Sequence, residues 1–117
     1  MKAFKDRCAQ GDCMLIRVAS IPKNATPVKS DGGYYILAHS ETNHHHAVVA
    51  KPNVRLFSTD NPLISYLEVV EATDQTETLL KHLRSFDTHE TIAIPPGTYE
   101  IRRQREYTPE GWRRVAD

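Results

Sequence analysis

The chain has 117 residues, which predicts one domain that buries about two thirds of its unfolded surface. Fifteen Lys and Arg residues balance fifteen Asp and Glu residues, so the formal net charge is zero and the whole molecule has no long-range attraction for nucleic acids or anionic membranes. No segment resembles a secretory signal or approaches the roughly 20 apolar residues of a membrane span. We therefore expect a soluble, cytoplasmic protein with no membrane partner.

Cys8 and Cys13 are the only cysteines, and four residues separate them. Neither their number nor their spacing suits a disulfide framework or a usual zinc knuckle. The sequence therefore predicts two reduced thiols.

Short segments of β character, separated by turns, follow one another along the chain. The expected strands cover residues 13–18, 34–39, 46–50, 54–57, 63–71, 91–94 and 98–107. Residues 34–39 and 46–50 are apolar on both faces, which predicts central strands that pair as a hairpin. Residues 21–33 are rich in Pro, Asn and Gly and predict a surface loop. Pro-Pro-Gly at residues 95–97 predicts a type II turn that reverses the chain.

Residues 74–86 fit two structures. Asp74 and Glu77 have the spacing of a capping box, and the following leucines fit a helical stripe. The same residues also fit a strand that runs through His82. We favour a strand followed by a loop, with a short helix as the alternative.

These elements together predict an all-β fold. Seven to eight short strands with at most one short helix indicate a small antiparallel barrel or sandwich. We expect one domain over residues 1–117, with a polar C-terminal tail from about residue 108.

Residues 39–46 hold four of the six histidines and one glutamate. With a four-residue loop in the hairpin, His39 lies opposite His46, and Glu41 and His44 lie at the mouth of the loop. Directly opposite side chains share a face with Cβ atoms about 5 Å apart, so these groups would converge on a divalent metal such as zinc, manganese, iron or nickel. A three-residue loop would pair Ser40 with His46 instead and scatter the imidazoles over both faces.

The predicted metal ligands are His39, Glu41, His44, His46 and His89. His89 is included because it precedes a strand and lies beside Glu90, whereas His82 is more typical of a surface histidine. The competing interpretation is an exposed histidine run that binds nothing.

The expected strand at residues 98–107 is the second group with chemical potential. Alternation places Tyr99, Ile101, Arg103, Arg105 and Tyr107 on one face. An arginine that leans toward a core needs a carboxylate or an anionic ligand, and arginines beside aromatic rings can hold phosphates while bases stack. The alternative is a solvated edge strand, which we favour for Arg102, Arg113 and Arg114.

Catalysis, if present, is predicted to use Glu41, His44, Arg103, Arg105 and Tyr107. A histidine would act as general base or acid, and the arginines would stabilise the negative charge of a phosphoryl transition state.

Three stretches of the chain carry a resemblance to a known family: Gly11-Asp12 with the apolar strand after it, residues 37–46 and residues 94–107. They resemble a family of small uncharacterised bacterial and phage proteins that share a histidine-rich hairpin and a C-terminal Arg-Gln-Arg-Glu-Tyr strand. This resemblance implies no particular activity.

A weaker likeness is to cupins, small β-barrels in which a His-x-His strand, a downstream glutamate and a later histidine bind a metal. His44 and His46 match the first element, but no acid lies three or four residues after His46. That departure argues against a cupin-type metal-dependent enzyme.

Three functions remain. We rank first a β-barrel that binds a divalent metal, with metal-dependent catalysis as an extension, because it alone explains why an acid and imidazoles crowd one hairpin. The second is a metal-free protein that binds or cleaves RNA or a nucleotide. The third is a phage or mobile-element protein that binds and inhibits a host protein complex without catalysis. Aromatic positions around Phe57 and Tyr66 additionally suggest a homodimer.

Overall fold

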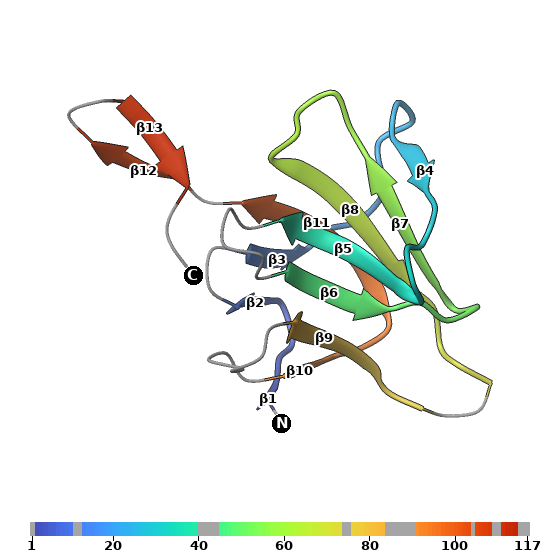
Figure 1. Ribbon diagram of the computed structural model, residues 1–117. Helices are drawn as coiled ribbons and strands as arrows, with labels where there is room; N and C mark the ends of the chain where they lie inside the picture. The colour runs from blue at the N-terminus through green and yellow to red at the C-terminus, as the bar shows by residue number, and fades with distance from the viewer. Residues whose placement is uncertain are drawn as a thin grey trace.

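The computed structural model describes residues 2–10, 13–39, 45–73, 76–83, 91–103, 105–108 and 111–114 (Figure 1). For residues 2–3, 38–39, 45, 82–83, 105–108 and 111–114 it describes the backbone. These parts of the chain hold thirteen strands and no helix, which confirms the all-β class. The described chain therefore contains no helix that could cross a bilayer.

The strands form two main sheets. The five-stranded sheet has the order β1-β10-β9-β6-β5, and the six-stranded sheet has the order β2-β3-β11-β8-β7-β4. Pairing is antiparallel throughout except between the short β1 and β10. The bounds are β1 Lys2–Ala3, β2 Arg7–Gln10, β3 Cys13–Arg17, β4 Thr26–Val28, β5 Tyr34–His39, β6 His45–Val49, β7 Val54–Ser58, β8 Ile64–Val69, β9 Thr78–Leu83, β10 Ile92–Ile94 and β11 Gly97–Arg103.

The core lies between these sheets, so the fold is a sandwich and not a closed barrel. Alternate residues of each strand point inward, as the period of two in a strand requires. The buried residues are Cys8, Cys13, Leu15, Val54, Leu56, Leu67, Val69, Tyr99 and Ile101 of the six-stranded sheet, and Leu37, Val48, Leu80, Ile92 and Ile94 of the five-stranded sheet. Cys8 and Cys13 are both reduced, as expected.

The ambiguous segment is a strand, β9, and not a helix. It lies between β6 and β10, so both of its backbone edges are paired, and it buries Thr78 and Leu80. Pairing on both sides satisfies more backbone groups than a short isolated helix could, and it overrides the local helical pattern. The loop expected after this strand lies in residues 84–90, outside the described residues.

Several expectations need correction. β5 and β6 do form a hairpin, but among the described strands β5 lies at the edge of its sheet, so only β6 is central. Part of the expected surface loop forms β4, which pairs with β7. The chain reverses at residues 95–97 as expected, but the expected type II turn is not formed, because β10 and β11 belong to different sheets and the chain crosses between them there. Gly97 has a φ of 158°, whereas a type II turn requires about +80°.

The long C-terminal strand is divided. β11 ends at Arg103, and a separate strand, β12 (Arg105–Thr108), pairs with β13 (Gly111–Arg114). The segment expected to be a polar tail thus contributes a strand. Figure 1 shows this hairpin lying away from the two sheets, at the C-terminal, red end of the chain.

Candidate functional site

The register of the β5–β6 hairpin differs from the expected one. His39 pairs with His45, and Ala38 pairs with His46. The predicted pair of His39 with His46 is therefore wrong. The pair of His39 with His45 leaves five residues, 40–44, between its partners, whereas the prediction assumed a four-residue loop. A bulge between Ile36 and Ala38 shifts the register once more, farther from the loop.

His46 is completely buried and forms part of a polar bridge between the two sheets. Its Nδ1 lies 2.9 Å from Oε1 of Gln10, which projects inward from β2 of the opposite sheet. The amide nitrogen of Gln10 donates a hydrogen bond of 3.2 Å to the carbonyl oxygen of Leu80 on β9. One buried glutamine thereby links three strands, β2, β6 and β9.

This bridge fixes the tautomer of the imidazole. A backbone carbonyl only accepts hydrogen bonds, so the Gln10 group that faces Leu80 must be the amide NH₂. The remaining oxygen, Oε1, also only accepts, so Nδ1 of His46 must carry the hydrogen. In the neutral ring, Nε2 then carries the lone pair and can accept a hydrogen bond or bind a metal.

The backbone gathers further histidines around His46. In the ladder of β6 and β9, His46 pairs with His82 and His45 pairs with Leu83. Together with the β5 pairs, this places four histidine positions on two adjacent rungs of three neighbouring strands. We call this region, comprising Gln10, His46 and positions 39, 45 and 82, the histidine end.

Three predicted ligands, Glu41, His44 and His89, lie outside the described residues, and the first two are also predicted catalytic residues. Of His39 the structure describes only the backbone. The side chains that the structure does describe contain no group of three His, Cys, Asp or Glu residues able to hold a metal. Of the predicted ligands, His46 is the one whose side-chain surroundings are described.

The predicted arginine face is confirmed in its first half. Tyr99 and Ile101 are fully buried, and the half-buried Arg103 follows on the same alternation. Arg103 pairs with Cys13, which in turn pairs with Gln10, so Arg103 lies near the histidine end. The second half of the predicted face, Arg105 and Tyr107, lies in β12, which pairs with β13 and not with this sheet.

Arg105 is paired with Arg114, and Tyr107 with Trp112, in the β12–β13 hairpin. The structure describes only the backbone of these residues. Arg105 and Tyr107 therefore pair in a different sheet from Arg103.

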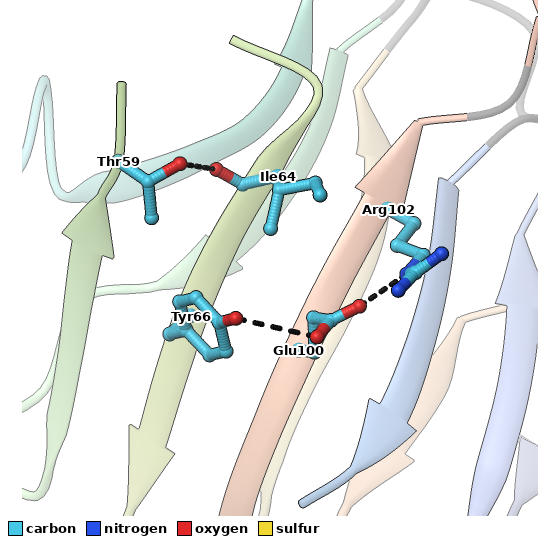
Figure 2. Close-up of polar contacts among 5 residues, drawn as sticks. All are labelled: Thr59, Ile64, Tyr66, Glu100 and Arg102. Carbon is cyan, nitrogen blue, oxygen red and sulfur yellow. Dashed lines mark hydrogen bonds and ion pairs between the residues drawn. The ribbon is translucent and has the colours of Figure 1, made fainter. Parts of the chain in front are cut away.

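The outer face of the six-stranded sheet carries a separate polar group (Figure 2). The Tyr66 hydroxyl donates to Glu100 Oε2 at 3.3 Å, and Arg102 forms an ion pair with Oε1 of the same carboxylate. Burial and the nearby carboxylate raise the pKa of Tyr66, while Arg102 opposes this shift. The Arg102 side chain is 56% exposed, so this arginine is the solvated residue that the sequence predicted.

Two functionally interesting residues escaped the sequence prediction. Gln10 is not among the candidate residues of the sequence, although the pattern Arg7-Cys8-Ala9-Gln10 alternates and places a polar residue in the core. Asn53 precedes β7 and lines a cavity at the other end of the sandwich. No local sequence pattern identified that cavity, because it is formed by segments that are distant in sequence.

No curated protein and no solved structure gives a significant match. A family model described as a domain of unknown function (DUF8820) matches residues 9–104. The match includes every strand of the two sheets except β1 and the first part of β2, and it ends before the β12–β13 hairpin. The chain therefore belongs to the DUF8820 domain family.

Proposed function

We propose that the protein binds a divalent metal ion at the histidine end, with Nε2 of His46 as one ligand. The observation that supports this most directly is the Gln10–His46 hydrogen bond, because it leaves the lone pair of the neutral ring on Nε2. Metal-binding histidines usually donate the hydrogen of their other nitrogen to an oxygen acceptor, which fixes the ring and raises its basicity. Gln10 Oε1 is such an acceptor for Nδ1 of His46.

The register supplies the second argument. His82 is the cross-strand partner of His46, and partners in an antiparallel ladder are the positions from which two side chains most readily reach one ion. We therefore propose His82 as a ligand in place of His39. Glu41, His44 and His89 are retained as proposed ligands from the sequence prediction. Imidazole-rich sites suit zinc, nickel, copper and iron better than magnesium or calcium.

Metal titration of untagged protein tests the proposal. After removal of metals with EDTA, calorimetric titration with Zn²⁺ should show one site per chain, and saturation should raise the melting temperature by mass action. His46→Asn should abolish this site. Gln10→Leu should weaken it by roughly 10- to 100-fold, as expected for a residue that orients a ligand.

Asp60→Asn is the matched control because Asp60 is exposed in a turn outside the histidine end. It should leave zinc affinity unchanged. A chain that binds none of zinc, manganese, iron or nickel at micromolar concentration would rule the proposal out. His46 would then be a structural residue that serves the bridge alone.

A second candidate function is binding or cleavage of RNA or a nucleotide without metal. Arg103 pairs with Cys13, which pairs with Gln10. This position favours the second function because a cation near an imidazole can hold a phosphate. His44, Glu41, Arg105 and Tyr107 remain proposed participants. Labelled RNA incubated with the protein in EDTA should be bound or cut, and Arg103→Met should reduce either effect. Intact, unbound RNA would remove this candidate.

The remaining hypotheses stay as sequence predictions. They are a bacterial or phage origin, a cupin-like metal site, inhibition of a host protein complex and a homodimer. Phe57 and Tyr66 do form a cross-strand pair on the outer face, which places the two expected dimer residues together. Sedimentation of wild type and Tyr66→Glu would test the dimer.

A further inference from the structure

We infer that the opposite end of the sandwich holds a binding site for a small organic cation with an apolar body and a protonated amine. The site is a cavity of about 480 Å³. Its volume lies within the roughly 300–1,000 Å³ of small-molecule pockets. We call this region the cavity end. Its lining includes Phe4, Asn53, Val70, Glu71, Glu77 and Pro96.

The lining is mostly apolar. It includes Phe4, Ile94 and Pro96, which come from the N-terminal segment and from the crossing between the sheets. Val70, also in the lining, is 51% exposed and is the one large apolar side chain exposed among the described residues. Apolar surface concentrated in a concave site favours an occupant with an apolar body.

Asn53 adds an unsatisfied acceptor to this lining. Its amide nitrogen donates to the carbonyl oxygen of Val70 at 2.8 Å and lies 3.5 Å from Oγ1 of Thr78, which fixes the orientation of the amide. The oxygen, Oδ1, is buried without a hydrogen-bond partner among the described residues. A buried carbonyl oxygen left without a donor costs about 1–3 kcal/mol, a cost that an occupant's N–H group would remove if it displaced the atoms that cover Oδ1.

The charge of the lining indicates the sign of the occupant. Glu71 and Glu77 are the charged residues among the described lining, and both are exposed. Two basic groups contact lining residues: the Lys51 ammonium donates to the Thr76 hydroxyl, and Arg17 donates to the carbonyl oxygen of Pro96, so both are already engaged. Two carboxylates at the rim favour a cation and disfavour a carboxylate ligand.

One wall of the cavity is held rigidly, which favours binding because little ordering is needed. The Tyr99 hydroxyl donates to the carbonyl oxygen of Pro95 at 2.6 Å, and Arg17 donates to that of Pro96 at 3.1 Å. Arg17 also lies 5.0 Å above the Tyr99 ring, and Phe4 packs edge-on against the same ring at 5.5 Å.

Three probes that share a phenylalkyl body and carry a cationic, a neutral or an anionic head group test the inference: phenylbutylamine, phenylbutanol and phenylbutyrate. Binding is followed in EDTA by NMR shifts of the backbone amides of Asn53, Val70 and Thr78, so that the result is independent of the metal proposal. We expect the amine to bind roughly tenfold more tightly than the alcohol, and the carboxylate to bind most weakly.

Variants then assign the effect to the cavity. The double variant Glu71→Gln, Glu77→Gln should remove most of the preference for the amine and leave the affinity for the alcohol unchanged. Glu68→Gln is the matched control, because Glu68 lies on the outer face opposite Arg55 and is not part of the lining. Ala72→Phe, which places a ring in the cavity, should weaken all three probes.

Some results would overturn the inference. They are equal affinities for the amine and the carboxylate, shifts at amides elsewhere in the chain, or no binding of any probe at millimolar concentration. If Ala72→Phe does not fold, the charge variants and the mapped shifts still decide the question.

Discussion

The histidine end and the cavity end lie at opposite ends of the same strands, but the interior of the sandwich is filled differently at each end. β9 begins with Thr78 in the cavity lining and reaches His82 at the histidine end, and β11 runs from Gly97 to Arg103 in the same way. At the histidine end, polar side chains from both sheets form hydrogen bonds in the interior. At the cavity end, the chain crosses between the sheets and leaves a hollow.

The difference shows what each end needs in order to be stable. A buried imidazole and a buried amide are tolerated only when each finds a partner, so the histidine end depends on one hydrogen-bonded bridge. The cavity end retains an unsatisfied oxygen and an apolar hollow, which are features that a ligand can complete. In variants that damage one end, ligand binding at the other end should therefore remain measurable.

The largest effect is expected from breaking the bridge. Gln10→Leu removes the donor to Leu80 and the acceptor for His46, and leaves two buried polar groups without this partner. Each such group costs about 1–3 kcal/mol, so we expect the free energy of unfolding to fall by roughly 3 kcal/mol. Urea denaturation measures this loss.

A double-mutant cycle with His46→Leu sharpens the result. The two residues act as a unit, so the double variant should lose clearly less than the sum of the single losses. Additive losses would show that the bridge contributes little beyond packing. Amine binding at the cavity end should persist in the folded fraction of each variant.

The next effect concerns the crossing at the cavity end. A Cβ at Gly97 would overlap Nη1 of Arg17, so Gly97→Ala must displace the guanidinium from Pro96 and Tyr99. We expect a loss of about 2 kcal/mol, from backbone strain at positive φ and from the lost hydrogen bonds.

Gly33→Ala is the control for that strain. Gly33 has a φ of 85°, and a Cβ there meets nothing within 4 Å. Its loss should be about 1 kcal/mol, from the backbone alone. If the two variants lose equal stability, Arg17 does not brace the wall of the cavity. Thermal melts of both variants and amine binding by Gly97→Ala would show which applies.

The sequence predicted most of the fold because most of its strands have local patterns. Alternation in β11 placed Tyr99 and Ile101 in the core, and the apolar runs gave β5 and β6 as hairpin partners. β2 and β4 were missed because their few apolar residues carry too weak a pattern. These two segments become strands because they pair with β3 and β7.

The candidate site was harder to predict because its geometry is not local. The hairpin register at the histidines depended on the five residues that separate His39 from His45, one more than assumed, and a shift of one position moves every side chain to the other face. The partner of His46 is Gln10, 36 positions away and in the other sheet. No spacing within residues 39–46 contains that information. The sequence thus indicated the region of the candidate site, but it paired His46 with the wrong residue.

A smaller effect is expected in alkaline solution. Burial raises the pKa of Tyr99 above its ordinary value of 10.0, with Arg17 opposing the shift and Cys8 adding to it. Because the folded pKa is the higher one, the stabilisation is fully present below about pH 10 and is lost as pH rises through the folded pKa. Tyr99→Phe should be less stable at neutral pH, since it lacks two hydrogen bonds, but should lose less stability between neutral and alkaline pH. Urea titrations across this range measure the slope.

The smallest effect should come from the outer face, which belongs to neither end. Arg102→Met removes an exposed partner of Glu100, and such pairs contribute about 0–1 kcal/mol. Since Arg102 lowers the pKa of Tyr66, its removal should raise that pKa further, which an ultraviolet titration detects. Arg55→Met, which removes the partner of Glu68, should be equally mild but leave Tyr66 unchanged. A loss from Arg102→Met as large as that from Gln10→Leu would contradict the assignment of polar stabilisation to the buried bridge.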